Sequence, residues 1–258
     1  MSLFISSVFT YDEDAGNYIQ AVETADAQAL EPATRKAINN FVIGCKQDGI
    51  WTAIKASCIL AGARTLAGAL QPLVGTGPNR FGTEGGWSYN RETGLAGNGT
   101  DNYLDSNRNN NADPQNSKHI SAYLSTTGTG LIMGARSQTG GTTFDLGGAG
   151  FRCRLNTIQA SDDLTLSPAP TGYMGGSRNG ASSTVYRHSA LTIMGTSSSE
   201  TPQTESILIM ARRNPSTGLP EGFGTRRLAF YSIGESLDLA RLDARVTDLI
   251  NAFAVTIP

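Results

Sequence analysis

The chain has 258 residues, of which 39% are hydrophobic and 16% are charged, and its formal net charge is −2. This length predicts one or two domains with a core large enough to need no disulfide bonds. The 30 glycines indicate many turns and short strands, which argues against an all-helical enzyme. The sequence pI of about 5.7 argues against a nucleic-acid-binding protein, whose domains usually have a pI above ~9.

The cysteine and histidine content gives no sign of a metal or redox site. Cys45, Cys58 and Cys153 form no CxxC pair, and an odd number cannot all pair within one chain, so we expect free, buried thiols. Zinc is not expected, because His119 and His188 are the only histidines and neither lies near a cysteine in the sequence. We therefore expect no cofactor.

The sequence also predicts neither export nor membrane insertion. Its first residues lack a basic region followed by a sustained apolar run, so they do not resemble a signal peptide. No apolar run approaches the ~20 residues of a membrane span.

Residues 1–16 are predicted to form an N-terminal arm. The arm contains five large apolar residues, which are Leu3, Phe4, Ile5, Val8 and Phe9. So short an apolar segment does not form a core alone, and we expect it to support assembly by lying on a neighbouring subunit. The alternative is that it folds back as an edge strand of its own sandwich.

Residues 17–72 are predicted to form a helical subdomain. Apolar residues spaced for one helix face indicate a first helix around Tyr18 and Val22. A second helix is predicted to begin at Pro32, a residue favoured in a first turn, and to end near Gly49. The next apolar residues predict a third helix by their spacing, and they are Ile50, Ile54 and Cys58.

Residues 73–80 are rich in glycine and proline and are predicted to form a linker, and residues 81–258 are predicted to form a mainly β domain. Strand-like segments recur there at roughly the eight-to-twelve-residue spacing expected of a sandwich or barrel. They are 119–125, 131–136, 151–155, 183–187, 206–211 and 227–233. A final helix is predicted from the apolar stripe between Leu239 and Phe253, with Ser236 as its cap.

The common catalytic motifs are absent from the sequence. It contains no GxSxG, HExxH or P-loop motif, and no GxGxxG in a strand-turn-helix context. Glycoside hydrolysis needs two carboxylates about 5 to 9.5 Å apart, and the ExDxxE triplet of sandwich glucanases does not occur. We therefore expect no enzymatic activity. The enzyme alternative is polysaccharide cleavage through a carboxylate such as Asp145 or Glu205.

An asparagine-rich segment spans residues 104–113. Asp105, Asn107 and Asn109 resemble the start of a calcium loop, but the expected glycine and the late glutamate are both replaced by asparagine. Calcium binding by these three residues is one alternative. The others are that the side chains satisfy backbone groups of the loop, or that their amides are displayed to sugar hydroxyls.

Aromatic residues lie close to this segment, and sugar sites often combine an aromatic face with amides. The competing interpretation is that the tryptophan belongs to the core of the sandwich. The candidate glycan-binding residues are Trp87, Tyr89, Tyr103, Asn107, Arg108 and Asn110.

Three segments carry a resemblance to a known family. They are WSYNRETGLAGNGTDNYLDSNRNNNADPQNSKHISAYLST (87–126), ESILIMARRN (205–214) and RRLAFYSIGESLDLARLDARVTDLINAFAVTIP (226–258). Here the sequence resembles tailed-bacteriophage virion proteins with a laminin-G-like (LamG-like) or concanavalin A-like jelly roll. Residues 31–73 resemble the helical module that precedes it. The expected fold is mainly β, an antiparallel two-sheet jelly-roll sandwich with an α-helical N-terminal subdomain and a C-terminal helix.

The resemblance implies a structural protein of the bacteriophage virion, assembled in the host cytoplasm beside other virion proteins and without catalytic residues. Two roles stay open. One is a tail-associated adhesion module, in a fibre or baseplate, that binds host-surface polysaccharide. The polysaccharide binding is inferred from an analogy of fold. The other is a capsid-decorating or accessory protein that acts only through protein-protein interfaces. Because phage fibres and decoration proteins are often three-fold, we expect a homo-oligomer, and a trimer in particular.

Overall fold

The computed structural model describes residues 10–136, 143–147, 153–157, 171–188, 190–214 and 216–257. Within these ranges the chain is mainly β and has four α-helices. The helices are α1 (Glu13–Asp26), α2 (Pro32–Gln47), α3 (Leu66–Ala69) and α4 (Leu239–Thr256). None of the helices in the described ranges has the length and apolar character needed to cross a membrane.

The larger of two antiparallel sheets has eight strands in the described ranges. Its order is β12-β11-β10-β6-β16-β4-β3, and β1 also pairs with β16. The strands are β1 (Ile54–Ile59), β3 (Ser88–Asn90), β4 (Gly94–Ala96), β6 (Lys118–Leu124), β10 (Gly172–Gly180), β11 (Ser183–His188), β12 (Leu191–Gly195) and β16 (Leu228–Gly234).

The second antiparallel sheet has, among the residues described, six strands in the order β2-β5-β13-β7-β8-β9. The strands are β2 (Asn79–Phe81), β5 (Tyr103–Asn109), β7 (Leu131–Arg136), β8 (Thr143–Gly147), β9 (Cys153–Thr157) and β13 (Ser206–Ile209). Two short strands, β14 (Arg212–Arg213) and β15 (Pro220–Glu221), form a separate hairpin.

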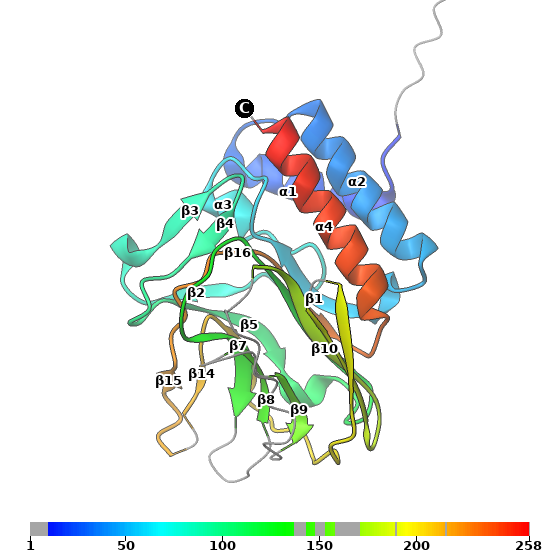
Figure 1. Cartoon of the computed structure of the whole chain (residues 1–258). Helices are drawn as coiled ribbons and strands as arrows, with labels where there is room; N and C mark the ends of the chain where they lie inside the picture. Colours follow the sequence, from blue (N-terminus) through cyan, green and yellow to red (C-terminus); the bar gives the residue numbers. More distant parts are fainter. Residues whose placement is uncertain are drawn as a thin grey trace, which may run out of the picture.

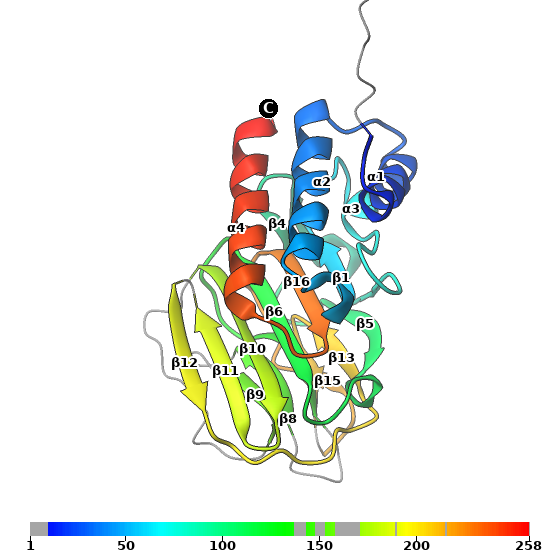
Figure 2. The same ribbon diagram turned by 90° about the vertical axis from the view of Figure 1, so that its right-hand side faces the viewer.

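The helices and the two sheets form three layers (Figures 1 and 2). Helices α1, α2 and α4 lie at one end of the molecule against the eight-stranded sheet, and α2 and α4 run side by side. One core fills the space between helices and sheet, where the rings of Phe41 and Phe230 meet edge to face with their centroids 5.7 Å apart. A second core lies between the sheets and includes Leu104, Ile120 and Ile209.

Strand β16 contributes to both cores. All seven of its residues are buried, as is typical of a strand covered on both faces. Phe230 faces the helices, while Leu228 and Tyr231 face the second sheet. The register against β6 shifts between Leu228 and Phe230, which is the signature of a β-bulge. The bulge explains how residues three positions apart face the same core.

The sequence predicted the second and the final helix correctly and the third helix wrongly. Helix α2 begins at Pro32, and α4 buries the predicted apolar stripe. The segment with Ile54 and Cys58 is strand β1, whose residues are almost all buried because the strand pairs with β16 between the two cores. Short, continuously apolar runs fit helix and strand equally well, so their spacing does not decide between them.

The cap of α4 also differs from the prediction. Asp238, rather than Ser236, caps the helix, since its carboxylate accepts hydrogen bonds from the N–H groups of Ala240 and Arg241 at 2.9 and 3.2 Å. A carboxylate is favoured at this position because it also interacts with the positive end of the helix dipole.

Strand β1 lies inside the range predicted to be a helical subdomain, yet it pairs with a strand of the C-terminal range. The division into residues 1–16, 17–72, 73–80 and 81–258 stays a prediction. The arm residues Leu3, Phe4, Ile5, Val8 and Phe9 lie outside the described residues.

The three cysteines are buried and none forms a disulfide bond, as predicted. Burial raises the pKa of both Cys45 and Cys58 to about 12. These two thiols therefore stay protonated at neutral pH and behave as small apolar side chains.

His119 is buried beneath the connection between β16 and α4. Its Nδ1 donates to the carbonyl oxygen of Glu235 at 2.6 Å, and its Nε2 lies 2.7 Å from the hydroxyl oxygen of Ser232. A carbonyl only accepts, so the proton of the neutral ring is on Nδ1 and the serine hydroxyl donates to Nε2. Burial, opposed by the bond to Glu235, lowers the pKa of His119 to about 4.

We predict that His119 makes the protein less stable as the pH falls from about 6.5 to about 4. In this interval the unfolded histidine binds a proton and the folded one does not, so the stabilisation is complete above pH 6.5 and is lost as the pH decreases. The free energy of unfolding should decrease by roughly 3 kcal/mol over the whole interval. Urea unfolding at two pH values, near 7 and near 4.5, measures it.

Replacement His119→Gln should reduce this pH dependence, whatever its effect on stability at pH 7. The matched control is His188→Gln at a half-buried histidine on β11, which should retain most of the wild-type pH dependence. If His119→Gln kept the wild-type pH dependence of stability, the low pKa of His119 would not be its cause.

Candidate functional site

The outer face of β5 gathers aromatic and polar side chains. Tyr103, Asp105 and Asn107 alternate with buried residues along the strand, so they point away from the core between the sheets. Strand β2 pairs with β5 and places Asn79 opposite Asp105 and Phe81 opposite Tyr103. The β14–β15 hairpin and the residues next to β13 border these two strands. We name this surface the β5 face, and it comprises Asn79, Phe81, Tyr103, Asp105, Asn107, Glu205, Arg212, Arg213, Asn214, Glu221 and Phe223.

Three aromatic rings form the apolar part of the β5 face. The rings of Phe81 and Tyr103 are stacked, with centroids 5.0 Å apart and planes 8° from parallel. Phe223 lies on Tyr103 at 6.2 Å with a 45° tilt. Phe81 is 42% exposed, whereas the other two rings are half-buried. Burial raises the pKa of Tyr103, which keeps its hydroxyl protonated at neutral pH. The ring of Phe81 is therefore accessible from solution and supported from behind.

Charged side chains lie next to these rings. The Nε of Arg213 is 3.1 Å from Oε2 of Glu205, and its Nη2 is 4.0 Å from Oδ2 of Asp105. Arg212 pairs with Glu221 at 3.0 Å. Two arginines thus face three carboxylates, and two of those carboxylates lie against the same guanidinium.

Hydrogen bonds hold the polar side chains of β5 in place. Oδ1 of Asp105 accepts from the backbone N–H of Asn107 at 2.9 Å and from the hydroxyl of Ser206. The amide of Asn107 donates to the carbonyl of Gly77 at 2.7 Å and accepts from the amide of Asn79 at 3.1 Å. Asn107 has a positive φ of 55°, a conformation that asparagine adopts more readily than most residues. The surface is therefore ordered before any ligand binds.

The calcium candidates Asp105, Asn107 and Asn109 lie on a strand rather than in a loop. The polar atoms of the first two are bonded to each other and to neighbouring strands. Calcium takes six to eight oxygen ligands, typically including several carboxylates. Across the described ranges, no group of three or more histidines, cysteines or acidic residues is placed to hold a metal ion.

Of the six predicted glycan-binding residues, the structure brings Tyr103 and Asn107 together on the β5 face. Trp87 and Tyr89 belong to the segment of β3, which is part of the other sheet. Trp87 packs against the core between the sheets. The hydroxyl of Tyr89 donates to the carbonyl of Ala63 at 2.6 Å. Both residues therefore pack within the fold.

Arg108 and Asn110 are bound within the protein as well. The Nε of Arg108 donates to the buried carboxylate of Asp113 at 2.9 Å. Asn110 is fully buried, and its amide donates to Asn156 at 3.0 Å and to Gln203 at 2.8 Å. The amide of Asn110 is therefore not available to a ligand at the surface.

The sequence reasoning did not connect Phe81, Phe223 and Arg213 with this surface. They come from segments far apart in the chain, and the pairing of β2 with β5 and the position of the β14–β15 hairpin bring them together. In the sequence, Glu205 stands as an isolated acid. Asp145, the other acid considered for cleavage, has a side chain outside the described part of the structure.

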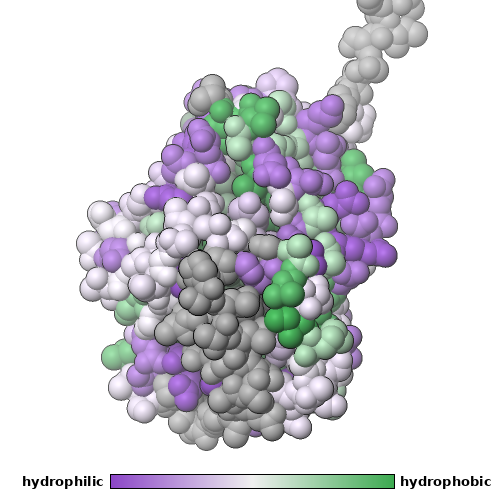
Figure 3. Space-filling model, viewed as in Figure 1, coloured by the Kyte–Doolittle hydropathy of each residue, from purple (hydrophilic) through white to green (hydrophobic). Residues whose placement is uncertain are grey.

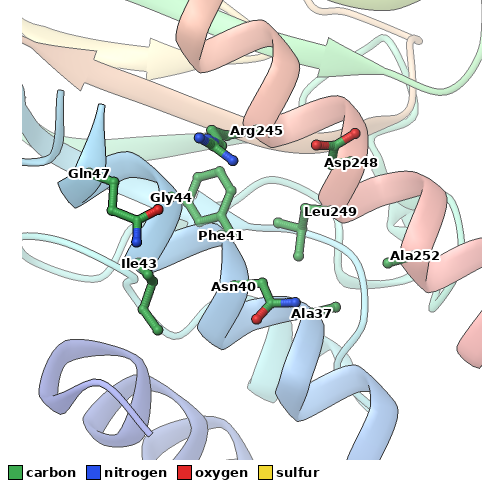
Figure 4. A pocket seen from close by; sticks show the side chains of 10 residues that line it. All are labelled: Ala37, Asn40, Phe41, Ile43, Gly44, Gln47, Arg245, Asp248, Leu249 and Ala252. Atoms are coloured by element: carbon green, nitrogen blue, oxygen red, sulfur yellow. The ribbon is translucent and has the colours of Figure 1, made fainter. Parts of the chain in front are cut away.

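A groove of about 370 Å³ lies between α2 and α4 (Figure 4). Phe41 and Leu249, both nearly fully buried, line it, and Asp48 holds the guanidinium of Arg245 beside it through bonds of 2.7 and 3.0 Å. No ring in this groove is open to solvent in the way that Phe81 is. On the described part of the face in Figure 3, hydrophobic surface is divided into small, separate patches. The β5 face is therefore the better candidate for ligand binding.

No protein-family model and no curated protein sequence matches this chain. Several solved structures are similar to parts of it, including the following two. A mutant of Trypanosoma rangeli sialidase displaying trans-sialidase activity is 10% identical, with a TM-score of 0.47, and the match covers 83% of this chain. Domain 4 of AbnA, a GH43 extracellular arabinanase from Geobacillus stearothermophilus in complex with arabinotriose, is 12% identical with a TM-score of 0.33.

The second match covers 58% of this chain and 75% of the arabinanase domain. The first covers 39% of the sialidase, so the chain spans about two fifths of that protein's length.

The prediction of no enzymatic activity is wrong as an exclusion. The two structures described above come from proteins named as enzymes, a sialidase and an arabinanase. The motif search tested only local spacing, whereas carboxylates that act together are often supplied by different strands. Asp105 and Glu205, for example, are 100 positions apart in the chain and lie against one arginine, so no local motif contains both.

Proposed function

We propose that this protein binds carbohydrate through the β5 face. The observation that carries the proposal is the exposed ring of Phe81, stacked on Tyr103 and bordered by Asp105, Asn107 and Arg213. An aromatic ring offers a large, rigid apolar surface for the C–H face of a sugar. Carboxylate, amide and guanidinium groups beside it supply the acceptors and donors that sugar hydroxyls need.

A purely structural role for the aromatic rings is the competing explanation. Cross-strand aromatic pairs stabilise a sheet by about 0.2–1 kcal/mol, and β2 is a short edge strand that benefits from such a pair. This role requires no open ring face. The exposure of Phe81 and the fixed polar groups beside it favour binding.

Replacement Phe81→Ala is expected to weaken glycan binding about tenfold, because losing one aromatic contact costs roughly 1.4 kcal/mol. Isothermal titration against a panel of polysaccharides and their oligosaccharides measures the affinity. The control is Leu191→Ala, an exposed apolar residue on β12 in the other sheet, which should bind as the wild type does. Thermal unfolding of both variants separates lost binding from lost structure. Equal affinity of Phe81→Ala and wild type would contradict the proposal.

Cleavage of the bound glycan is a second candidate function, and the placement of Asp105 and Glu205 against Arg213 favours it. Glycoside hydrolysis uses two carboxylates about 5 to 9.5 Å apart. Cleavage predicts release of reducing sugar from a glycan that binds, with a loss of at least ~100-fold in Glu205→Gln. No release of reducing sugar from any glycan that binds would contradict this second candidate.

We further propose that binding serves a bacteriophage virion, where the protein attaches to host-surface polysaccharide as part of the tail. The support is the resemblance of residues 87–126, 205–214 and 226–258 to virion proteins with a concanavalin A-like jelly roll. Two antiparallel sheets around a common core are compatible with that topology. A trimeric assembly with other virion proteins belongs to the same proposal. The capsid-decorating or accessory role is its alternative.

Mass spectrometry of purified virions tests whether the protein is part of the phage particle. The proposal expects the protein in intact particles, and expects antibody-labelled gold particles at the tail in electron micrographs. Labelling on the capsid would support the alternative, and absence of the protein from purified particles would contradict both.

A further inference from the structure

Carboxylates outnumber cations on the β5 face. Glu205 and Asp105 flank Arg213, and Glu221 pairs with Arg212. Each guanidinium is therefore already engaged by a carboxylate of the protein. A ligand carboxylate that bound here would have to displace one of these partners and leave a protein carboxylate without its counterion.

Two amide donors of the face are also in use. The amide of Asn107 donates to the carbonyl of Gly77, and the amide of Asn214 donates to Oε2 of Glu221 at 2.6 Å. Acceptors are more available, because the side chain of Glu205 is 34% exposed and contacts Arg213 through Oε2. A ligand that donates hydrogen bonds matches this surface better than one that only accepts them.

We propose that the β5 face selects uncharged, hydroxyl-rich glycans and rejects acidic ones. This inference rests on the proposed carbohydrate binding and names the class of glycan. Hydroxyl groups donate to the exposed carboxylate oxygens while the apolar face of the sugar covers Phe81. A uronic acid instead brings a negative charge toward Asp105, Glu205 and Glu221. The face therefore distinguishes neutral from acidic glycans both by attracting hydroxyl groups and by repelling carboxylates.

Matched pairs of oligosaccharides test the inference, because each pair differs only in the replacement of a hydroxymethyl group by a carboxylate. The probes are β-1,4-mannan and β-1,4-polymannuronate fragments, and β-1,4-glucan and β-1,4-polyglucuronate fragments, of equal length. For the pair whose neutral member binds, we expect at least about tenfold tighter binding of that member at low salt. The ratio should decrease as added salt screens the charges.

Replacement Glu205→Gln removes one repulsive charge and leaves Asp105 as the carboxylate partner of Arg213. We expect the affinity for the acidic member to rise about fivefold relative to the neutral member at low salt. The control is Glu92→Gln, which changes the net charge equally at an exposed residue between β3 and β4 and should leave the ratio unchanged.

The outcomes distinguish a failure of the selectivity from a failure of carbohydrate binding itself. Phe81-dependent binding in which the acidic member equals or exceeds its neutral partner would overturn the selectivity and leave carbohydrate binding intact. An absence of Phe81-dependent binding to both members of every pair would overturn carbohydrate binding, and the selectivity with it.

Discussion

A strand with apolar side chains on both faces has to be covered twice, and in this protein that strand is β16. Helices α2 and α4 cover the side of Phe230, while the six-stranded sheet covers the side of Leu228 and Tyr231. Strands β1, β4 and β6 pair with its edges. Burial of each large side chain contributes about 1.5–3 kcal/mol, so this arrangement stabilises all three layers together. The order of the layers leaves the outer face of the six-stranded sheet opposite the helices.

The β5 face depends on this arrangement for its geometry. The inward residues of β5, such as Leu104, are fixed in the core between the sheets, so the alternate residues Tyr103, Asp105 and Asn107 have fixed positions outside. The register with β2 then places Phe81 on Tyr103. A binding surface that is ordered in advance loses little conformational entropy when a ligand binds.

Local signals were sufficient for several elements and misleading for others. Pro32 and the apolar stripe up to Phe253 predicted two helices correctly, because a helix is defined by neighbours in sequence. The segment around Cys58 required knowledge of its partner strand, since an apolar run buried on both sides has no characteristic period. The helix is capped by the carboxylate of Asp238, two residues after the predicted cap Ser236.

The candidate site shows the same limit more strongly. Trp87 and Tyr103 are close in sequence, yet they belong to segments of different sheets. Phe81 and Arg213 are far apart in sequence and contribute to one surface, because β2 pairs with β5 and the β14–β15 hairpin borders β5. Asn110 is not part of the surface either, because it is buried and its amide is hydrogen-bonded inside the protein. Composition indicated the chemistry of the surface, but strand register decides which residues form it.

Nuclear magnetic resonance titration of the isotope-labelled protein with a neutral oligosaccharide tests the central claim most directly. The account predicts that backbone amide shifts of Phe81, Tyr103, Asn107 and Arg213 change together with one binding curve, while residues lining the α2–α4 groove stay unchanged. Shifts concentrated in that groove, or no saturable change at the β5 face with any glycan, would contradict it.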